Sequence, residues 1–314
     1  MKNFLNKFFF RSKNLDQVSE KIKNISRQTP VSKIFETINN YSSDSEIRYV
    51  GGCVRKSIKN ENIDDIDLAT NLTPNEVCEA LQKKEINYYE TGVEHGTVTA
   101  VINEHKFEIT SLRKDVSTDG RHAKVIFSTN WNEDAARRDF TINAIYADIE
   151  GRIFDPLNGR EDLKNKLVKF IGNVEERIQE DYLRILRYFR FFLQYSDKPH
   201  DQQVIKSIKK HINGINHLSK ERIFDELKKI LILNNLYSLF SQSESKEVIL
   251  SIFPQFKYHE RLKIFNQLNK NIKIKYDNCL ILALLIVDKS NNYEYFCHKY
   301  KTSNSIKNRL SIIS

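Results

Sequence analysis

The chain has 314 residues, of which 40% are hydrophobic and 29% are charged, and its formal net charge is +9. This length suits two or more domains, and no run approaches the ~20 consecutive apolar residues of a membrane span, so we expect a globular protein without a membrane segment. The positive balance favours an acidic partner, usually a nucleic acid, although a solvated basic surface would give the same charge.

The cysteines and the first residues bear on the compartment. The four cysteines are Cys53, Cys78, Cys279 and Cys297, and none lies in a C-x-x-C pair. Their scatter argues against a zinc site and favours a reducing, cytoplasmic setting. The apolar run in Met1–Lys13 is short and no small-residue cleavage site follows it, so we do not expect a signal peptide.

In chain order, two helices are expected first, over residues 15–40, with Pro30 before the second one at Val31–Asn40. Short β-rich runs follow from Ile47 to Asp148, at Arg48–Val50, Ile66–Leu68, Val98–Ile102, Phe107–Thr110 and Val125–Phe127. Between them Pro74–Lys83 is typical of a helix that Thr73 caps. After Asp162 the pattern is helical almost to the end. The expected class is α/β or α+β, with a catalytic domain to about residue 150 and a helical remainder.

The glycine pair Gly51-Gly52 stands between a strand-like run, Ile47–Val50, and a helix-like run, Cys53–Ile58. Such a strand-to-helix turn leaves backbone N–H groups unpaired at the start of the helix. These groups suit an anion such as a triphosphate.

Asp65 and Asp67 flank Ile66 in a run that we predict to be a strand over Ile63–Ala69. Side chains two apart on a strand share a face, so both carboxylates would point the same way and hold a divalent cation or a pair about 3.5–4 Å apart. Glu108, in the alternating run Phe107–Thr110, would complete a metal-binding triad. The alternatives are a hairpin tip with solvated acids and a solvent-facing glutamate.

Two further segments concentrate charge. Arg137–Ala144 holds two arginines, an aspartate and an asparagine, a set that can bind phosphate oxygens and ribose hydroxyls. The alternative is a helix start with ion pairs to Glu133 and Asp134. In Glu180–Arg187, helical spacing would put Asp181, Arg184 and Arg187 on one face. That face would read the amine and ring nitrogen that cytosine and adenine share, unless it is only a salt-bridged surface.

Taken together, these strings resemble the class II CCA-adding tRNA nucleotidyltransferases and the bacterial poly(A) polymerases. The similar strings, in the order of that family, are Gly51–Arg55, Asp65–Thr70, His95–Val98, Glu108–Thr110, Asp119–Arg121, Arg137–Ala144, Asp155–Gly159, Glu180–Arg187 and Leu218–Ile223. The resemblance covers about residues 46–230. It implies an α+β class, with a polymerase-β-like nucleotidyltransferase head over 1–150, an all-helical neck over 151–230 and an all-helical body and tail over 231–314.

The resemblance also implies roles for individual residues. Asp65 and Asp67 match the metal-binding pair, for which we expect Mg²⁺, and Glu108 matches a third catalytic carboxylate. The nucleotide-binding positions are Gly51, Gly52 and Arg55 at the triphosphate, Arg138, Asp139 and Asn143 at the ribose and its surroundings, and Asp181, Arg184 and Arg187 at the base. Asp119, Gly120 and Arg121 fall in a flexible loop, residues 113–124, that helps the family switch from C to A addition.

The function expected on this basis is template-independent addition of C, C and A to tRNA from CTP and ATP. A poly(A) polymerase or an A-adding enzyme on the same fold remains an alternative. A catalytically silent RNA-binding protein is a third, against which the retained Asp65, Asp67 and Asp181 weigh. From Lys257 onward the chain carries eleven Lys or Arg and four Asp or Glu. We therefore expect RNA contacts there, at Lys273 and Lys275. The oligomeric state stays open.

Overall fold

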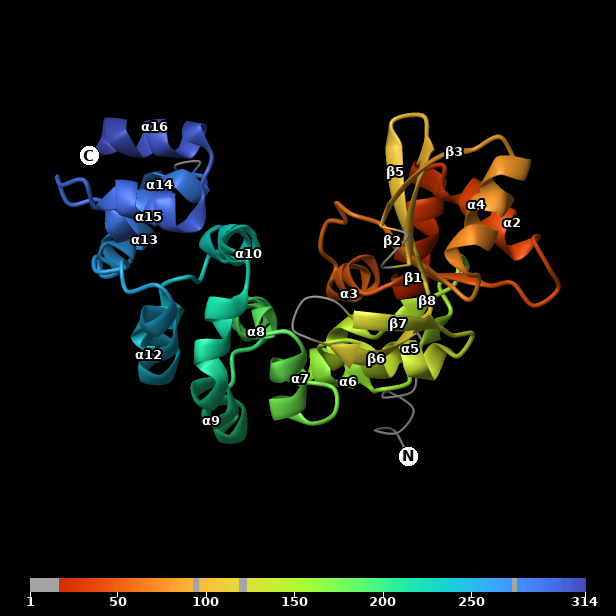
Figure 1. Cartoon of the computed structure of the whole chain (residues 1–314), viewed down its shortest axis with the longest axis horizontal. Coiled ribbons are helices and arrows are strands. Elements are labelled where there is room, and N and C mark those ends of the chain that lie inside the picture. Colours follow the sequence, from red (N-terminus) through yellow and green to blue (C-terminus); the bar gives the residue numbers. More distant parts are fainter. Residues whose placement is uncertain (1–16, 93–95, 119–122, 273–275) are drawn as a thin grey trace, which may run out of the picture. The chain divides into compact units, whose positions relative to one another are not determined.

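The structure, a computed structural model, describes residues 17–92, 96–118, 123–272 and 276–314. The chain divides into two compact units (Figure 1). Of the described residues, the first unit takes in 17–92, 96–117, 123–165 and 169–172, and the second takes in 118, 166–168, 173–272 and 276–314. Among the described helices, none combines the length and the apolar character needed to cross a membrane.

A mixed sheet of seven strands organises the first unit, in the order β3-β4-β5-β2-β1-β8-β9. Its strands are β1 (Ile47–Val50), β2 (Asp67–Thr70), β3 (Asn87–Gly92), β4 (Thr97–Ile102), β5 (His105–Ser111), β8 (Tyr146–Ala147) and β9 (Ile153–Phe154). Neighbours run antiparallel except β2 and β5, which are parallel. A second sheet joins β6 (Arg113–Thr118) and β7 (Ala123–Phe127).

The first unit also contains helices. They are a helix over 17–28, α2 (Val31–Asn39), α3 (Gly52–Lys59), α4 (Pro74–Lys83), α5 (Trp131–Arg137), the 3₁₀ turn η2 (Thr141–Asn143) and α6 (Gly159–Lys164). Of these, α2, α3 and α4 contact the sheet. The predicted helix at Pro74–Lys83 is confirmed. Thr73 and Glu76 form a capping box at its start, which satisfies two backbone N–H groups that a helix end otherwise leaves unpaired.

The core of the first unit follows from strand alternation. Leu68 and Ile109 are fully buried on one face of the sheet, where they join Ile34 of α2 and Leu81 of α4. Because successive residues of a strand point to opposite faces, Glu108 leaves the sheet on the other side and is exposed. The carboxylates of Glu108 and of its ladder partner Asp67 therefore lie on the face that these two helices do not cover.

The second unit is helical, as predicted. Its elements are α7 (Val174–Glu180), α8 (Leu183–Tyr195), α9 (Gln202–His211), η3 (Ile212–His217), α10 (Lys220–Leu231), α11 (Ser238–Ser241), α12 (Ser243–Ile252), α13 (Arg261–Ile272), α14 (Asn278–Ile286), α15 (Asn292–Tyr300) and α16 (Asn304–Ile313). Together with the mixed sheet of the first unit, they confirm the expected α+β class with a helical remainder. The most apolar run of the chain forms α14, most of whose residues are buried.

One predicted strand was wrong in its limits. The strand expected over Ile63–Ala69 begins only at Asp67, where the ladder with β5 begins, and the ladder with β1 begins one residue later, at Leu68. Asp65 therefore lies before the strand. The segment matched to a flexible loop, residues 113–124, includes strand β6 and the first two residues of β7.

Candidate functional site

The glycine turn is built as predicted. Strand β1 ends at Val50, Gly51 takes φ 63°, a conformation that favours glycine, and α3 begins at Gly52. The Gly51 N–H donates to the Ile145 carbonyl at 3.1 Å, which ties the turn to the segment before β8. No side chain caps α3 and no acidic residue stands in its first turn. The N–H groups at the start of this helix can therefore bind an anion.

The carboxylate of Asp67 lies beside this turn. A Cβ placed on Gly52 would lie 3.6 Å from Asp67 Oδ2, so the start of α3 and the carboxylate are in van der Waals range. In the parallel ladder between β2 and β5, Asp67 is the partner of Glu108. Paired residues of neighbouring strands point to the same face, so these two carboxylates stand side by side.

The electrostatics of Asp67 reflect this crowding. Burial raises the pKa of Asp67, the charge of Glu108 raises it further and that of Asp65 adds to the effect, while Arg138 and Arg55 act in the opposite direction. The net shift is upward, because the nearby carboxylates and the loss of water outweigh the guanidinium groups. A bound cation relieves repulsion of this kind.

The carboxylates do not assemble into a closed metal cage. Across residues 17–92, 96–118, 123–272 and 276–314, no group of three or more His, Cys, Asp or Glu is arranged to hold an ion. Asp65 is exposed in the segment before β2, Asp67 is partly buried and Glu108 is exposed. The donor set fits a hard divalent cation such as Mg²⁺, which takes one or two carboxylates and completes its shell with water and phosphate oxygens.

Arg138 is fixed by a buried acid. Asp134, which is 1% exposed, accepts from Arg138 Nε at 3.0 Å, from Arg137 Nη2 at 2.6 Å and from the Tyr146 hydroxyl at 2.7 Å. Burial alone would raise the pKa of Asp134, but Arg138 and Arg137 outweigh it and hold this pKa at about 2. The ion pairs weighed as an alternative for this segment do exist with Asp134. They belong to the end of α5 and not to a helix start.

The same arginine reaches the glycine turn. A Cβ on Gly51 would lie 3.8 Å from Arg138 Nη1, so the guanidinium lies alongside the turn while its other side is held by Asp134. Neither Asp134 nor Tyr146 was assigned a role in the sequence. The spacing of four residues between Asp134 and Arg138 was the available signal for the first, and nothing local indicated the second.

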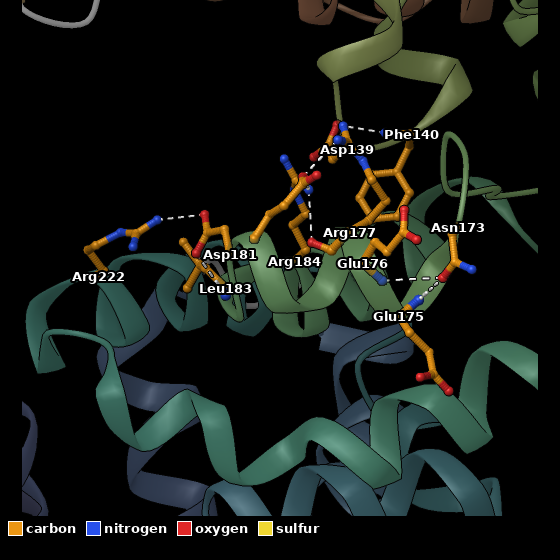
Figure 2. A network of polar contacts seen from close by, with 11 residues as sticks. Asp139, Phe140, Asn173, Glu175, Glu176, Arg177, Asp181, Leu183, Arg184 and Arg222 are labelled. Atoms are coloured by element: carbon orange, nitrogen blue, oxygen red, sulfur yellow. Dashed lines mark hydrogen bonds and ion pairs between the residues drawn. The ribbon is translucent and has the colours of Figure 1, made fainter. Parts of the chain in front are cut away.

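A buried chain of hydrogen bonds connects three more of the predicted residues. Arg55 donates to Asn143 Oδ1, and Asn143 Nδ2 donates to Asp139 Oδ1 at 2.8 Å. The Phe140 N–H donates to the same oxygen at 2.8 Å (Figure 2). Arg55, Asp139 and Asn143 are 6–8% exposed. The fold thus brings these side chains together and sets their orientation.

In the second unit, the segment Glu180–Arg187 is not one continuous helix, so the predicted shared face is wrong. Helix α7 ends at Glu180, Asp181 is extended with φ −154°, and α8 begins at Leu183. Asp181 Oδ1 accepts the Leu183 N–H at 3.1 Å. This bond satisfies a backbone group in the first turn of α8, and a short acceptor of this kind commonly starts a helix.

Asp181 and Arg184 have different hydrogen-bond partners. Asp181 Oδ2 accepts from Arg222 Nη2 at 2.8 Å, and Arg222 belongs to the first turn of α10 (Figure 2). Arg184 donates to the Arg177 carbonyl at 2.8 Å and to Glu180. Asp181 and Arg184, which we predicted to recognise the nucleotide base, are therefore positioned by different partners.

Of the remaining predicted residues, the structure describes Arg187 only. The Arg187 guanidinium lies 5.6 Å from the centre of the Phe191 ring, one turn along α8. Arg222 was part of the string Leu218–Ile223, but no role was assigned to it. The predicted residues Asp119, Gly120, Arg121, Lys273 and Lys275 lie outside the described residues.

Two families match the sequence. Residues 47–169 match the family described as "Poly A polymerase head domain". Residues 201–259 match the family described as "Probable RNA and SrmB- binding site of polymerase A". The first match includes the glycine turn, the carboxylates and the Arg138 segment, and the second includes Arg222.

Curated relatives and solved structures agree with these families. The mitochondrial CCA tRNA nucleotidyltransferase 1 of Homo sapiens is 45% identical over 230 residues, which are 72% of this chain and 52% of the relative. The CCA-adding enzyme of Lactobacillus johnsonii is 31% identical over 276 residues, 85% of this chain and 67% of the relative. The chain thus spans about half the length of the first relative.

A solved tRNA nucleotidyltransferase, complexed with a primer tRNA and an incoming ATP analogue, has the same fold. The TM-score is 0.67 at 21% identity, with 93% of this chain and 83% of the other covered.

Proposed function

This chain belongs to the family of CCA-adding tRNA nucleotidyltransferases, and on that premise we propose that it adds C, C and A to the 3′ end of tRNA from CTP and ATP. The pairing of Asp67 with Glu108 beside the uncapped start of α3 carries the proposal. Crowded carboxylates next to unpaired backbone N–H groups suit a cation and a triphosphate together.

The reaction is a phosphoryl transfer. The oxygen of the RNA 3′-hydroxyl attacks the α-phosphate of the incoming nucleotide, and pyrophosphate leaves. Asp65 and Asp67 would hold Mg²⁺, which when bound favours deprotonation of the attacking hydroxyl and offsets the charge of the leaving group. Glu108, the neighbour of Asp67 in the sheet, is the third catalytic carboxylate of the proposal.

The triphosphate and the sugar would be held by residues that the fold has already oriented. The N–H groups at the start of α3, from Gly52 onward, and the guanidinium of Arg138 bind phosphate oxygens, with Arg55 nearby. Because the hydrogen bond to Asp134 already fixes the side chain of Arg138, this side chain loses little entropy when a phosphate binds. Asp139 and Asn143, linked by their own hydrogen bond, contact the ribose.

The base would be selected by Asp181 and Arg184. Cytosine and adenine both present an exocyclic amine beside a ring nitrogen, so a carboxylate can accept from the amine while a guanidinium donates to the ring. Uracil and guanine present a carbonyl to the carboxylate, and a buried mismatch of this kind is strongly rejected. Arg222 fixes the direction of the Asp181 oxygens, and Arg187 flanks the pair.

The decisive experiment is an addition assay. Purified protein is incubated with Mg²⁺ and tRNA that ends before CCA, with CTP, ATP, UTP or GTP singly and in pairs, and the products are sequenced. We expect two C residues with CTP alone, a complete CCA with CTP and ATP, and no extension with UTP or GTP. A protein that binds this tRNA but extends it with none of the nucleotides would contradict the proposal.

One observation favours a second candidate. The matching head family is described by poly(A) polymerase, so the same site supports A addition. In the addition assay, a poly(A) polymerase would give long A tracts with ATP alone. An A-adding enzyme would add one A only to tRNA that already ends in CC.

RNA contacts are assigned to the second unit, in keeping with the domains expected over 151–230 and 231–314. The match over 201–259 and the basic residues from Lys257 onward support this assignment. For the compartment we propose the cytoplasm, because all four cysteines are free thiols. The human relative is mitochondrial by name. Fractionation of cells that express the protein distinguishes the two compartments.

A further inference from the structure

The catalytic carboxylates continue into a row of residues across the sheet. Asp67 pairs with Glu108, Glu108 pairs with Thr99, and Thr99 pairs with Tyr89, so the row crosses β2, β5, β4 and β3. Directly paired residues of neighbouring strands share a face. All four side chains therefore leave the sheet on the side opposite the core.

The far end of this row is an aromatic ring in solvent. Tyr89 is 57% exposed, whereas its neighbour Tyr88, on the other face, packs against the core. The fold uses the ring of Tyr88 for packing and does not bury that of Tyr89. Three inter-strand spacings separate Tyr89 from Asp67, roughly 14 Å along the sheet. A few unpaired nucleotides of a single strand span such a distance.

The adjacent rung adds polar groups to the same face. Residues two apart on a strand share a face, so Lys106 lies beside Glu108, and Asn87 lies beside Tyr89. Lys106 and Asn87 are exposed. An open aromatic ring, an amide and an ammonium group on one sheet face form the combination that binds single-stranded nucleic acid. The ring stacks on a base and the cation contacts a phosphate.

We propose that this face, formed by Tyr89, Thr99, Asn87 and Lys106, binds the unpaired 3′ end of the RNA. Tyr89 stacks on a base upstream of the reacting nucleotide, and Lys106 contacts a phosphate between that base and the 3′-hydroxyl. This inference rests on the proposed function, because it takes RNA as the acceptor. It goes further by assigning the path of the RNA end across the head and a stacking residue for it.

The first test compares Tyr89→Ala with Tyr89→Phe, which keeps the ring and removes only the hydroxyl. We expect Tyr89→Ala to raise the KM for tRNA roughly tenfold, in line with the loss of one base–aromatic stack. The KM for CTP should not change, and Tyr89→Phe should behave as wild type. Because the ring is exposed, both variants should unfold at the wild-type temperature.

The second test does not require catalysis, so it separates this inference from the proposed function. A tRNA with a fluorescent purine analogue among its last unpaired bases is bound without nucleotide. Wild type and Tyr89→Phe should quench the fluorescence, and Tyr89→Ala should not. If the wild-type protein adds no nucleotides but still quenches the fluorescence, and Tyr89→Ala does not, the proposed CCA addition is rejected and the proposed path of the RNA end is supported. Equal quenching and equal KM for tRNA in Tyr89→Ala and Tyr89→Phe would overturn the inference.

Discussion

Asp181 and Arg222 form an ion pair, with 2.8 Å between Oδ2 and Nη2, although 41 residues separate them in the sequence. The pair connects the break between α7 and α8 to the first turn of α10. The other oxygen of Asp181 accepts the Leu183 N–H. Both oxygens are therefore oriented by the protein itself, which is what the proposed selection of a base without a template strand would require.

The first prediction concerns Arg222. In Arg222→Ala, Asp181 loses the partner that directs Oδ2, so discrimination for CTP and ATP over UTP and GTP should fall about three- to tenfold. The discrimination shown by Arg222→Lys should lie between that of the alanine variant and that of wild type. Because the pair is partly exposed, stability should change by less than about 1 kcal/mol. The ratio of kcat/KM values reports the effect, and an unaltered ratio would assign the ion pair a purely structural role.

Replacing Asp181 itself should have a larger effect. Asp181→Ala removes the acceptor that favours an amine and disfavours a carbonyl, so activity with CTP and ATP should fall. Its preference over UTP and GTP should shrink tenfold or more, since a polar group left unpaired against the bound base costs about 1–3 kcal/mol. The affinity for metal, measured by titration calorimetry in the absence of RNA, should stay the same. Unchanged selectivity in this variant would mean that Glu180–Arg187 is only an ion-pair network.

Substitution of Asp65 or Asp67 by Ala should abolish addition. The loss of one metal-holding carboxylate should cost several kcal/mol of the activation barrier, on the order of a thousand-fold in rate. Single-turnover assays with saturating tRNA and CTP measure this loss directly. Circular dichroism should show an intact fold. Near-normal turnover in either variant would reject the metal assignment.

Asp67 should also limit stability. The fold raises the pKa of Asp67 above its ordinary 3.8, so the protonated acid stabilises the folded state and that contribution is lost as pH rises through the raised value. At neutral pH the charged carboxylate is therefore unfavourable, and Asp67→Asn should raise the Tm by roughly 1–3 °C. Added Mg²⁺ should raise the Tm of wild type and have no effect on this variant.

Asp134 should have the opposite pH dependence. Its folded pKa of about 2 lies below the ordinary 3.8, so its contribution to stability is present above 3.8 and is lost as pH falls from there toward 2. Asp134→Asn leaves two arginines without their buried partner, at a cost of about 3–5 kcal/mol. Urea titrations between pH 7 and pH 2 should show that the free energy of unfolding falls steeply with decreasing pH in wild type and less steeply in the variant. Parallel curves would contradict the assignment.

The basic C-terminal segment should bind RNA through phosphates. Lys273→Glu combined with Lys275→Glu should weaken tRNA binding. The logarithm of the binding constant should also fall less steeply with the logarithm of the salt concentration, because fewer counterions are released. The affinity for free ATP should not change. Lys33→Glu combined with Lys84→Glu makes the same change of charge in the first unit and serves as the matched control. Equal slopes in the two double variants would show that Lys273 and Lys275 make no specific contact.

Local rules were sufficient for the features that depend on neighbours in the sequence. The turn at Gly51 requires a positive φ, the helix after Thr73 has its capping box within four residues, and Glu108 alternates with buried Phe107 and Ile109. These features are determined by backbone sterics and by strand or helix periodicity. Sequence alone therefore gave the α+β class, the helical remainder and the identity of the candidate site residues.

Only the tertiary structure decided where those residues stand. Strand β2 begins at Asp67, and not at Ile63, because its ladder partners begin at Asp67 on β5 and at Leu68 on β1. Between α7 and α8, the Asp181 carboxylate accepts hydrogen bonds from the Leu183 N–H and from the guanidinium of the distant Arg222. Strand register placed Tyr89 in line with Glu108. Apart from the Leu183 N–H, each of these partners is remote in the sequence, and only folding brings it into contact.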